Sequence, residues 1–296
     1  MAKSRPKASG STALFVAVCT ARPPERAAEA VAALRRQVPE ERLAVIASGG
    51  GPREGAIHEP RPGLSHARNR ALAWAEELGA EALAYVDDDA VVDPGWYEAL
   101  VRRWDEAPPE VACIGGPIRP RFEIPPPPWY SDAIRHVLTL LDRGPAVRDL
   151  DPDEEAVYGA NVSFRVEPLR AAGGFDPALG HSGRRVFFGE EDEVQRELVR
   201  RGHRVRYVPD AGVEHVIPPE RLTRGSFVRR RFAFGAALGM RRGRSPGLAA
   251  RRALAGAAGV LVAAGSGRGA LAMDRAVRAA ENAGVLYGSI RPRRIA

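Results

Sequence analysis

The sequence of 296 residues is poor in cysteine, in lysine and in long apolar runs. Its two cysteines, Cys19 and Cys113, each lie in an apolar segment, which indicates buried side chains and excludes a disulfide framework or a cysteine metal site. Two unpaired cysteines fit a reducing compartment, so we expect a cytoplasmic protein. The longest nearly apolar run, residues 253–264, is about half of the ~20 residues that a membrane-spanning helix needs, and no spanning segment is expected.

The two commonest nucleotide-binding signatures are also missing. The spacing G-x-G-x-x-G fails at every register around the glycine run at 49–51, and G-x-x-x-x-G-K-[ST] does not occur in the chain. These absences exclude the ordinary dinucleotide-binding and P-loop classes.

The positive charges are almost all arginine, since Lys3 and Lys7 are the only lysines, and they are unevenly distributed. The net charge is +7, but residues 221–296 hold sixteen arginines and two acids, which gives +14 there and −7 in the rest of the chain. Such asymmetry indicates an anionic partner for the tail. We expect the tail to pack on the core or to contact an anionic membrane peripherally, at the inner face of the cell membrane. Few aromatics are available for base stacking, so no specific nucleic acid is expected.

Apolar segments of strand length alternate with segments of helical spacing through most of the chain. The expected strands are residues 13–19, 43–47, 83–86, 111–115 and 204–208. Strand, helix, strand order predicts right-handed parallel crossovers. We therefore predict one α/β domain over residues 12–235, with a mostly parallel central sheet flanked by helices. A disordered tail at 1–11 is predicted before it, and an arginine-rich helical extension at 236–296 after it.

Three adjacent acids, Asp87, Asp88 and Asp89, end the apolar segment 83–86. Unpaired carboxylates are costly to bury, so they are expected to hold a cation at the carboxyl edge of the sheet, where open α/β sheets bind ligands. The alternation of an extended strand predicts that Asp87 and Asp89 converge while Asp88 points away. Oxygen ligands with substrate phosphates suit Mg²⁺ or Mn²⁺. The alternative is an acidic turn that only caps a strand.

Further charged residues occur where catalysis or phosphate binding would need them. Glu190, Glu191 and Asp192 open a predicted helix, whose dipole would hold a general base ionised. His215 follows a strand and a turn and is a candidate metal ligand through its neutral imidazole. Arg68 lies in the first turn of a helix, an unfavourable end for a cation unless an anion is near. Ordinary acid enrichment at helix starts and a structural histidine remain the alternatives.

Together these segments resemble the family-2 inverting glycosyltransferases, which have the GT-A fold. The matching pieces follow the family's order over residues 12–235: 63–69, Asp87-Asp88-Asp89, Gly159-Ala160-Asn161-Val162-Ser163-Phe164-Arg165, Gly173-Gly174-Phe175-Asp176, Gly189-Glu190-Glu191 and 209–215.

The resemblance implies a nucleoside-diphosphate sugar as donor, with a UDP-sugar favoured, and a bound divalent cation, Mg²⁺ or Mn²⁺. It implies Asp89 as the main metal ligand with Asp87 and His215 beside it, and inversion at the anomeric carbon. Glu191 matches the catalytic base, with Glu190 and Asp192 as neighbouring candidates. The expected donor contacts are Thr20, Arg22, Arg68, Asp87, Asp88 and Arg230.

Three other classes remain open from the residues alone. A haloacid-dehalogenase-type phosphatase also has D-x-D after a strand, but this chain has no lysine beyond position 7. A nucleotidyltransferase acting on a sugar phosphate shares strand-end acids, but the first loop here, Thr20-Ala21-Arg22-Pro23, is not glycine-rich. A non-enzymatic module could bind phosphates or nucleic acid through the arginine-rich tail.

Overall fold

The computed structural model describes residues 11–178, 181–182, 185–186, 189–240, 246–265 and 268–290. Nearly all of the predicted disordered tail, residues 1–11, lies outside these residues, as do Arg241, Arg242 and Arg244 of the basic tail.

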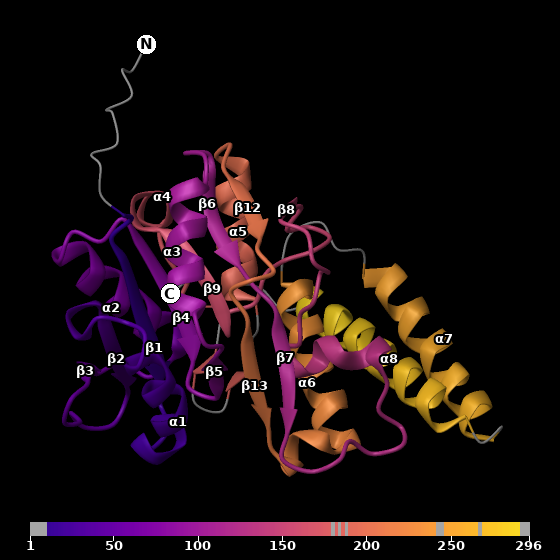
Figure 1. The fold of residues 1–296 in the computed structure, drawn as a ribbon. Helices are drawn as coiled ribbons and strands as arrows, with labels where there is room; N and C mark the ends of the chain where they lie inside the picture. Colours follow the sequence, from indigo (N-terminus) through magenta and orange to yellow (C-terminus); the bar gives the residue numbers. More distant parts are fainter. Residues whose placement is uncertain are drawn as a thin grey trace.

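A large eight-stranded sheet forms the centre of the molecule, in the order β3-β2-β1-β4-β9-β6-β12-β8 (Figure 1). Its strands are β1 (Leu14–Thr20), β2 (Leu43–Ser48), β3 (Ile57–Glu59), β4 (Ala82–Asp87), β6 (Val111–Gly115), β8 (Arg148–Leu150), β9 (Asn161–Arg165) and β12 (Arg204–Tyr207). Every residue of β1 is buried, as expected for a strand in the middle of a covered sheet. The α/β class with a large central sheet is confirmed.

The strand directions are mixed. Strands β1 to β4 are parallel to one another, and β6 is parallel to β12, but β9 lies antiparallel between β4 and β6. The physical reason is that the chain leaves β6 at the carboxyl edge and, after β7 and β8, is again at that edge at Asn161, which pairs with Val86 near the end of β4. It therefore enters β9 from that edge and runs back.

Five helices accompany this sheet: α1 (Pro24–Arg35), α2 (Leu64–Glu77), α3 (Trp96–Glu106), α4 (Val166–Ala171) and α5 (Glu190–Arg200). Short 3₁₀ turns occur at η1 (Glu40–Arg42), η2 (Asp132–Leu138) and η3 (Pro219–Leu222), and β10 (His181–Ser182) pairs with β11 (Arg185–Val186). Helix α3 illustrates the packing, since Trp96, Leu100 and Trp104 recur at helical spacing and are all buried.

A small second sheet, in the order β5-β13-β7, continues the carboxyl edge of the first. Its strands are β5 (Ala90–Val92), β7 (Ile118–Phe122) and β13 (Val213–Ile217). Strand β13 pairs antiparallel with β5, in a register that places His215 opposite Ala90. This pairing brings His215 beside the acidic turn that precedes β5.

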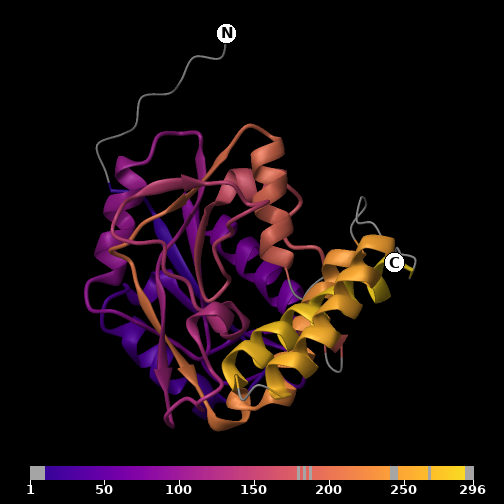
Figure 2. The same ribbon diagram turned by 90° about the vertical axis from the view of Figure 1, so that its right-hand side faces the viewer.

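Three helices at the C-terminus lie side by side at one edge of the molecule (Figures 1 and 2). They are α6 (Arg224–Gly239), α7 (Pro246–Gly265) and α8 (Gly269–Ser289), and α8 packs against both of the others. The backbones of α6 and α8 touch, since a Cβ on Gly235 would lie 2.0 Å from the carbonyl oxygen of Glu281. The predicted helical extension is present, and its predicted start at residue 236 falls inside α6.

One described helix, over Pro246–Ala264 with a mean hydropathy of 1.3, is long and apolar enough to cross a membrane by length and composition. The expectation that no segment reaches this length was therefore wrong. The sequence-based expectation counted apolar residues only after Arg252, whereas the helix begins at Pro246 and includes both Arg251 and Arg252.

Candidate active site

The acidic turn follows directly from the end of β4. The strand ends at Asp87, and Asp88 and Asp89 form the turn into β5. Thr20 Oγ1 donates a hydrogen bond to Asp88, and Arg22 Nη1 lies 3.2 Å from Asp88 and 2.9 Å from Asp89. The expectation that Asp88 points away was therefore wrong. The extended strand ends at Asp87, so the alternation of side chains along a strand does not apply to Asp88 in the turn.

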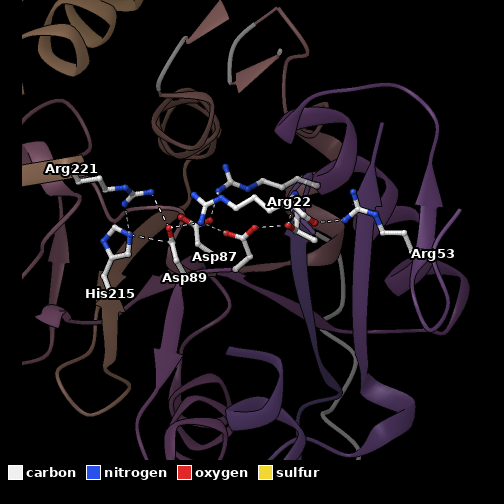
Figure 3. Close-up of polar contacts among 9 residues, drawn as sticks. Arg22, Arg53, Asp87, Asp89, His215 and Arg221 are labelled. Carbon is white, nitrogen blue, oxygen red and sulfur yellow. Dashed lines mark hydrogen bonds and ion pairs between the residues drawn. The ribbon is translucent and has the colours of Figure 1, made fainter. Parts of the chain in front are cut away.

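Asp89 lies at the centre of a polar cluster (Figure 3). Its Oδ1 is 3.2 Å from His215 Nε2, and its Oδ2 accepts from Arg221 Nη2 at 2.9 Å. Arg221 Nη1 is also 2.8 Å from His215 Nε2. His215 Nδ1 lies 2.9 Å from the carbonyl oxygen of Leu138, which can only accept. Nδ1 therefore carries a proton, and Nε2 faces Asp89 and Arg221.

The two acids of the turn differ in their tendency to ionise. Burial disfavours the charge on Asp89, but His215, Arg221 and Arg22 outweigh it and hold the pKa of this carboxyl well below its usual range. Burial raises the pKa of Asp88, although Thr20 and Arg22 oppose the effect. Asp89 is therefore the acid of this turn that is most firmly held as a carboxylate.

A buried arginine connects the acidic turn to helix α5. Arg68 is 2% exposed and places Nη1 at 2.8 Å from Glu190 Oε1 and 3.7 Å from Glu191 Oε2, and Nη2 at 3.6 Å from Asp87 Oδ1. A Cβ on Gly159 would lie 2.1 Å from Arg68 Nη2, so the glycine makes room for the guanidinium. These contacts all lie inside the protein, and a contact between Arg68 and the donor stays a prediction.

The acids that open α5 occupy different environments. Glu190 is buried against Arg68, and burial together with Glu191 raises its pKa to about 8. Glu191 accepts a hydrogen bond from the Gly159 amide at 3.2 Å. Gln195, one turn later, exchanges two hydrogen bonds with the backbone of Val157 and so fixes α5 against this loop. Among these acids, Glu191 combines a fixed position with access to a cavity.

That cavity measures about 80 Å³ and lies between α5, η2 and α6. It is lined by His136, Val137, Thr139, Tyr158, Gly189, Glu191, Asp192, Arg230, Arg231 and Phe234. Arg230 donates from Nε to the carbonyl oxygen of Val137 at 3.0 Å, and burial lowers its pKa to about 10. The cavity therefore brings the expected residues Glu191, Asp192 and Arg230 together.

Residues 16–137 match the family model described as glycosyl transferase family 2. Over these residues the chain is similar to the family-2 glycosyltransferases. The matched region contains the acidic turn, Arg68 and most of η2, while α5 and His215 lie beyond it.

Two curated relatives are similar in sequence. A glucosyl-dolichyl phosphate glucuronosyltransferase of Haloferax volcanii is 28% identical over 153 residues, which cover 50% of this chain and 48% of that protein. The succinoglycan biosynthesis protein ExoM of Rhizobium meliloti is 25% identical over 240 residues, 74% of this chain and 72% of that protein. The chain thus spans about half the length of the first relative and most of the second.

Two solved structures share the fold of this chain. The mannosyltransferase PcManGT of Pyrobaculum calidifontis, in complex with GDP-Man and Mn²⁺, superposes with a TM-score of 0.59 at 19% identity, covering 92% of this chain and 86% of that one. GalNAc-T7 with UDP, GalNAc and Mn²⁺ gives a TM-score of 0.53 at 17% identity, covering 75% and 48%. These likenesses confirm the GT-A fold.

In the structure the expected site residues form two adjoining groups. One group surrounds the acidic turn: Thr20, Arg22, Asp88, Asp89 and His215. The other surrounds Arg68 and the cavity: Arg68, Asp87, Glu190, Glu191, Asp192 and Arg230. Sequence reasoning missed Arg221, whose position six residues after His215 was the available signal, and it missed His136, Tyr158 and Phe234, which no local pattern marks.

The donor atoms at Asp89 suit a divalent cation. An imidazole nitrogen and a carboxylate oxygen face each other here at 3.2 Å. Neighbouring ligands of an octahedral ion held at about 2.1 Å lie about 3 Å apart, so the spacing fits. Among the described residues no three acidic or histidine side chains are already arranged around one point, and Arg22 and Arg221 neutralise Asp89 in this arrangement. The residue types fit a metal, and its full ligand set stays a prediction.

His136 in the cavity wall predicts a pH dependence of stability. Burial and the neighbouring Arg231 lower its pKa from 6.5 to about 4. Between these values the unfolded chain binds a proton that the folded chain does not, so this stability is present above pH 6.5 and is lost as the pH falls toward 4. Urea unfolding should show that a change from pH 7 to pH 5 costs the wild type about 2 kcal/mol more than His136→Gln. Equal losses in both proteins would contradict the assignment.

Proposed function

We propose that this chain transfers a sugar from a nucleoside diphosphate to a hydroxyl acceptor, with inversion at the anomeric carbon. The observation that carries the proposal is the position of Asp89, held as a carboxylate between His215, Arg22 and Arg221 at the carboxyl edge of the sheet. Glu191 lies on the adjoining cavity and supplies a base.

The leaving group of this reaction is a nucleoside diphosphate, so negative charge grows where it departs. Asp89 and His215, with Asp87, would hold Mn²⁺ or Mg²⁺, which when bound neutralises that charge as a Lewis acid. Arg22 and Arg221 already lie at the same carboxylate and can donate to phosphate oxygens. The two similar structures contain Mn²⁺, one with GDP-Man and one with UDP, so the UDP-sugar favoured by the sequence stays part of this proposal.

Glu191 is the proposed base because its neighbours fix it beside open space. It removes the proton of the acceptor hydroxyl as the hydroxyl oxygen bonds to the anomeric carbon and the bond to the diphosphate breaks. Glu190 is less suitable because it is enclosed and paired with Arg68 at 2.8 Å. Asp192 also lines the cavity and is the second candidate.

The other classes receive no support from the comparisons. Both curated relatives and both structures named above concern sugar transfer or polysaccharide synthesis by name, and none is a phosphatase, a nucleotidyltransferase or a nucleic-acid-binding module. With the transfer activity we propose a cytoplasmic location, in keeping with two free cysteines that are both buried.

A thermal-shift screen tests the donor class. The protein is melted with uridine, guanosine, thymidine, adenosine or cytidine diphosphate, each with and without Mn²⁺. One diphosphate at about 100 times its Kd should add about 2.7 kcal/mol of stability and raise Tm by about 5 °C, only when Mn²⁺ is present. The matching nucleoside serves as control, and no shift with any diphosphate would refute the proposal.

A further inference from the structure

The outer face of α7 is an apolar surface that no other described element covers. α7 packs on α8, where Gly256 faces Ala279 and the carbonyl oxygen of Gly259 accepts from Arg275 Nη1 at 2.7 Å. On the other side, Leu254 is 73% exposed, Leu261 76% and Val262 69%. A contiguous apolar patch of this kind marks an interaction site.

The patch is continuous along the helix. Leu254, Ala258 and Leu261 follow one another at four and three residues, so they form one stripe, and Val262 lies beside it. Between residues 253 and 265 the helix contains only alanine, glycine, valine and leucine. No polar side chain interrupts the stripe over three turns.

The charge beside the patch has one sign. Helix α7 contains no aspartate or glutamate, and its two charged residues, Arg251 and Arg252, are exposed just before Leu254. Other arginines of the helical extension have partners inside it: Arg231 pairs with Glu281, and Arg278 lies 3.1 Å from Asp274. The helix therefore offers an apolar face whose end is basic.

We propose that α7 docks flat on an anionic phospholipid surface. Leu254, Leu261 and Val262 enter the boundary of the acyl chains, while Arg251 and Arg252 bind headgroup phosphates. Anionic lipid supplies the negative charge that a second copy of α7 lacks, which favours lipid over self-association. The membrane contact expected for the basic tail is thus assigned to the outer face of α7.

The packing on α8 favours this flat orientation over a spanning one. Arg275 holds the middle of α7, and α8 carries Asp274, Arg275 and Arg278 within two turns. Crossing the bilayer would draw these charges into hydrocarbon or separate the two helices, and both are costly. A helix held along its inner face can still present its outer face to lipid.

Co-sedimentation of the full chain with vesicles tests the surface. We expect binding to vesicles of phosphatidylglycerol and phosphatidylcholine, and much weaker binding to phosphatidylcholine alone or in high salt. The triple variant L254Q/L261Q/V262T should weaken binding by on the order of tenfold per leucine. The double variant R251Q/R252Q should weaken it about fivefold per arginine on the anionic vesicles only.

Matched control substitutions are available on helices that flank the central sheet, outside the helical extension. L78Q alters an exposed leucine at the end of α2, and R35Q/R36Q alters two adjacent exposed arginines at the end of α1; both should bind vesicles like the wild type. Circular dichroism melting checks that every variant folds, and a sodium carbonate wash should release the wild type from the vesicles.

Four outcomes would overturn the proposal. The first two are that the wild type does not bind the anionic vesicles and that the triple variant binds as tightly as the controls. Retention after the carbonate wash would show a spanning helix. If sedimentation velocity shows that the triple variant dissociates a dimer while vesicle binding is unaffected, the face belongs to a second copy.

Discussion

Glu191→Gln lowers kcat by about 10²–10⁴-fold, the usual contribution of a general base. The substitution keeps the size of the side chain and its oxygen, so the hydrogen bond from the Gly159 amide at 3.2 Å can persist. Donor binding should therefore remain close to wild type. The measurement is steady-state sugar transfer, together with the Tm shift caused by the nucleoside diphosphate and Mn²⁺.

The matched control for this variant is Glu193→Gln, on the same helix. Glu193 pairs with Arg200 at 2.9 Å on the outer side of α5, so its loss should leave transfer unchanged. If Glu191→Gln keeps wild-type kcat while Asp192→Asn loses it, the base role passes to Asp192. Loss of donor binding in Glu191→Gln would instead show that this side chain holds the donor.

Asp89→Asn should lower transfer by about 10³-fold and remove the Mn²⁺-dependent part of donor binding. The substitution removes the carboxylate that the pKa direction identifies as the most firmly ionised acid of the turn. It also leaves Arg22 and Arg221 without their shared anion, and metal-assisted charge neutralisation contributes several kcal/mol to such reactions. Transfer rates over a Mn²⁺ titration and thermal shifts with and without Mn²⁺ give the measurement.

Asp93→Asn is the control, because Asp93 lies directly after β5, four residues beyond Asp89, and is paired with Arg119 away from the cluster. It should keep both the rate and the Mn²⁺ response. An unchanged Mn²⁺ response in Asp89→Asn would show that the cation lies elsewhere. The proposal for the leaving group would then fail even if Glu191 proved to be the base.

The two variants also probe separate halves of one connected site. Arg68 lies between them, with Asp87 at 3.6 Å on the side of the acidic turn and Glu190 at 2.8 Å on the side of α5. The rings of Tyr85 and Phe175 lie within 6 Å of its guanidinium carbon and limit its movement. The arrangement relates the position of the base helix to that of the strand end through one buried ion-pair network.

Local sequence determined the elements and much of the chemistry. The apolar segment at 111–115 is β6 residue for residue, and the segment at 204–208 extends one residue beyond β12. Asp87 ends β4 as expected, and the acids at 190–192 begin α5. These features depend on periodicity and helix-start chemistry over a few residues, so the sequence alone could specify them.

Only the tertiary structure decided how these elements meet. Strand order placed β9 between β4 and β6, and the pairing of β13 with β5 brought His215 and Arg221 to Asp89. Which acid of α5 is enclosed by Arg68 and which borders the cavity depends on packing between residues more than 100 positions apart. The same holds for α7, whose outer apolar face is defined by its packing on α8. Periodicity specifies an element and its apolar side, but contacts between distant segments arise only when the whole chain is packed.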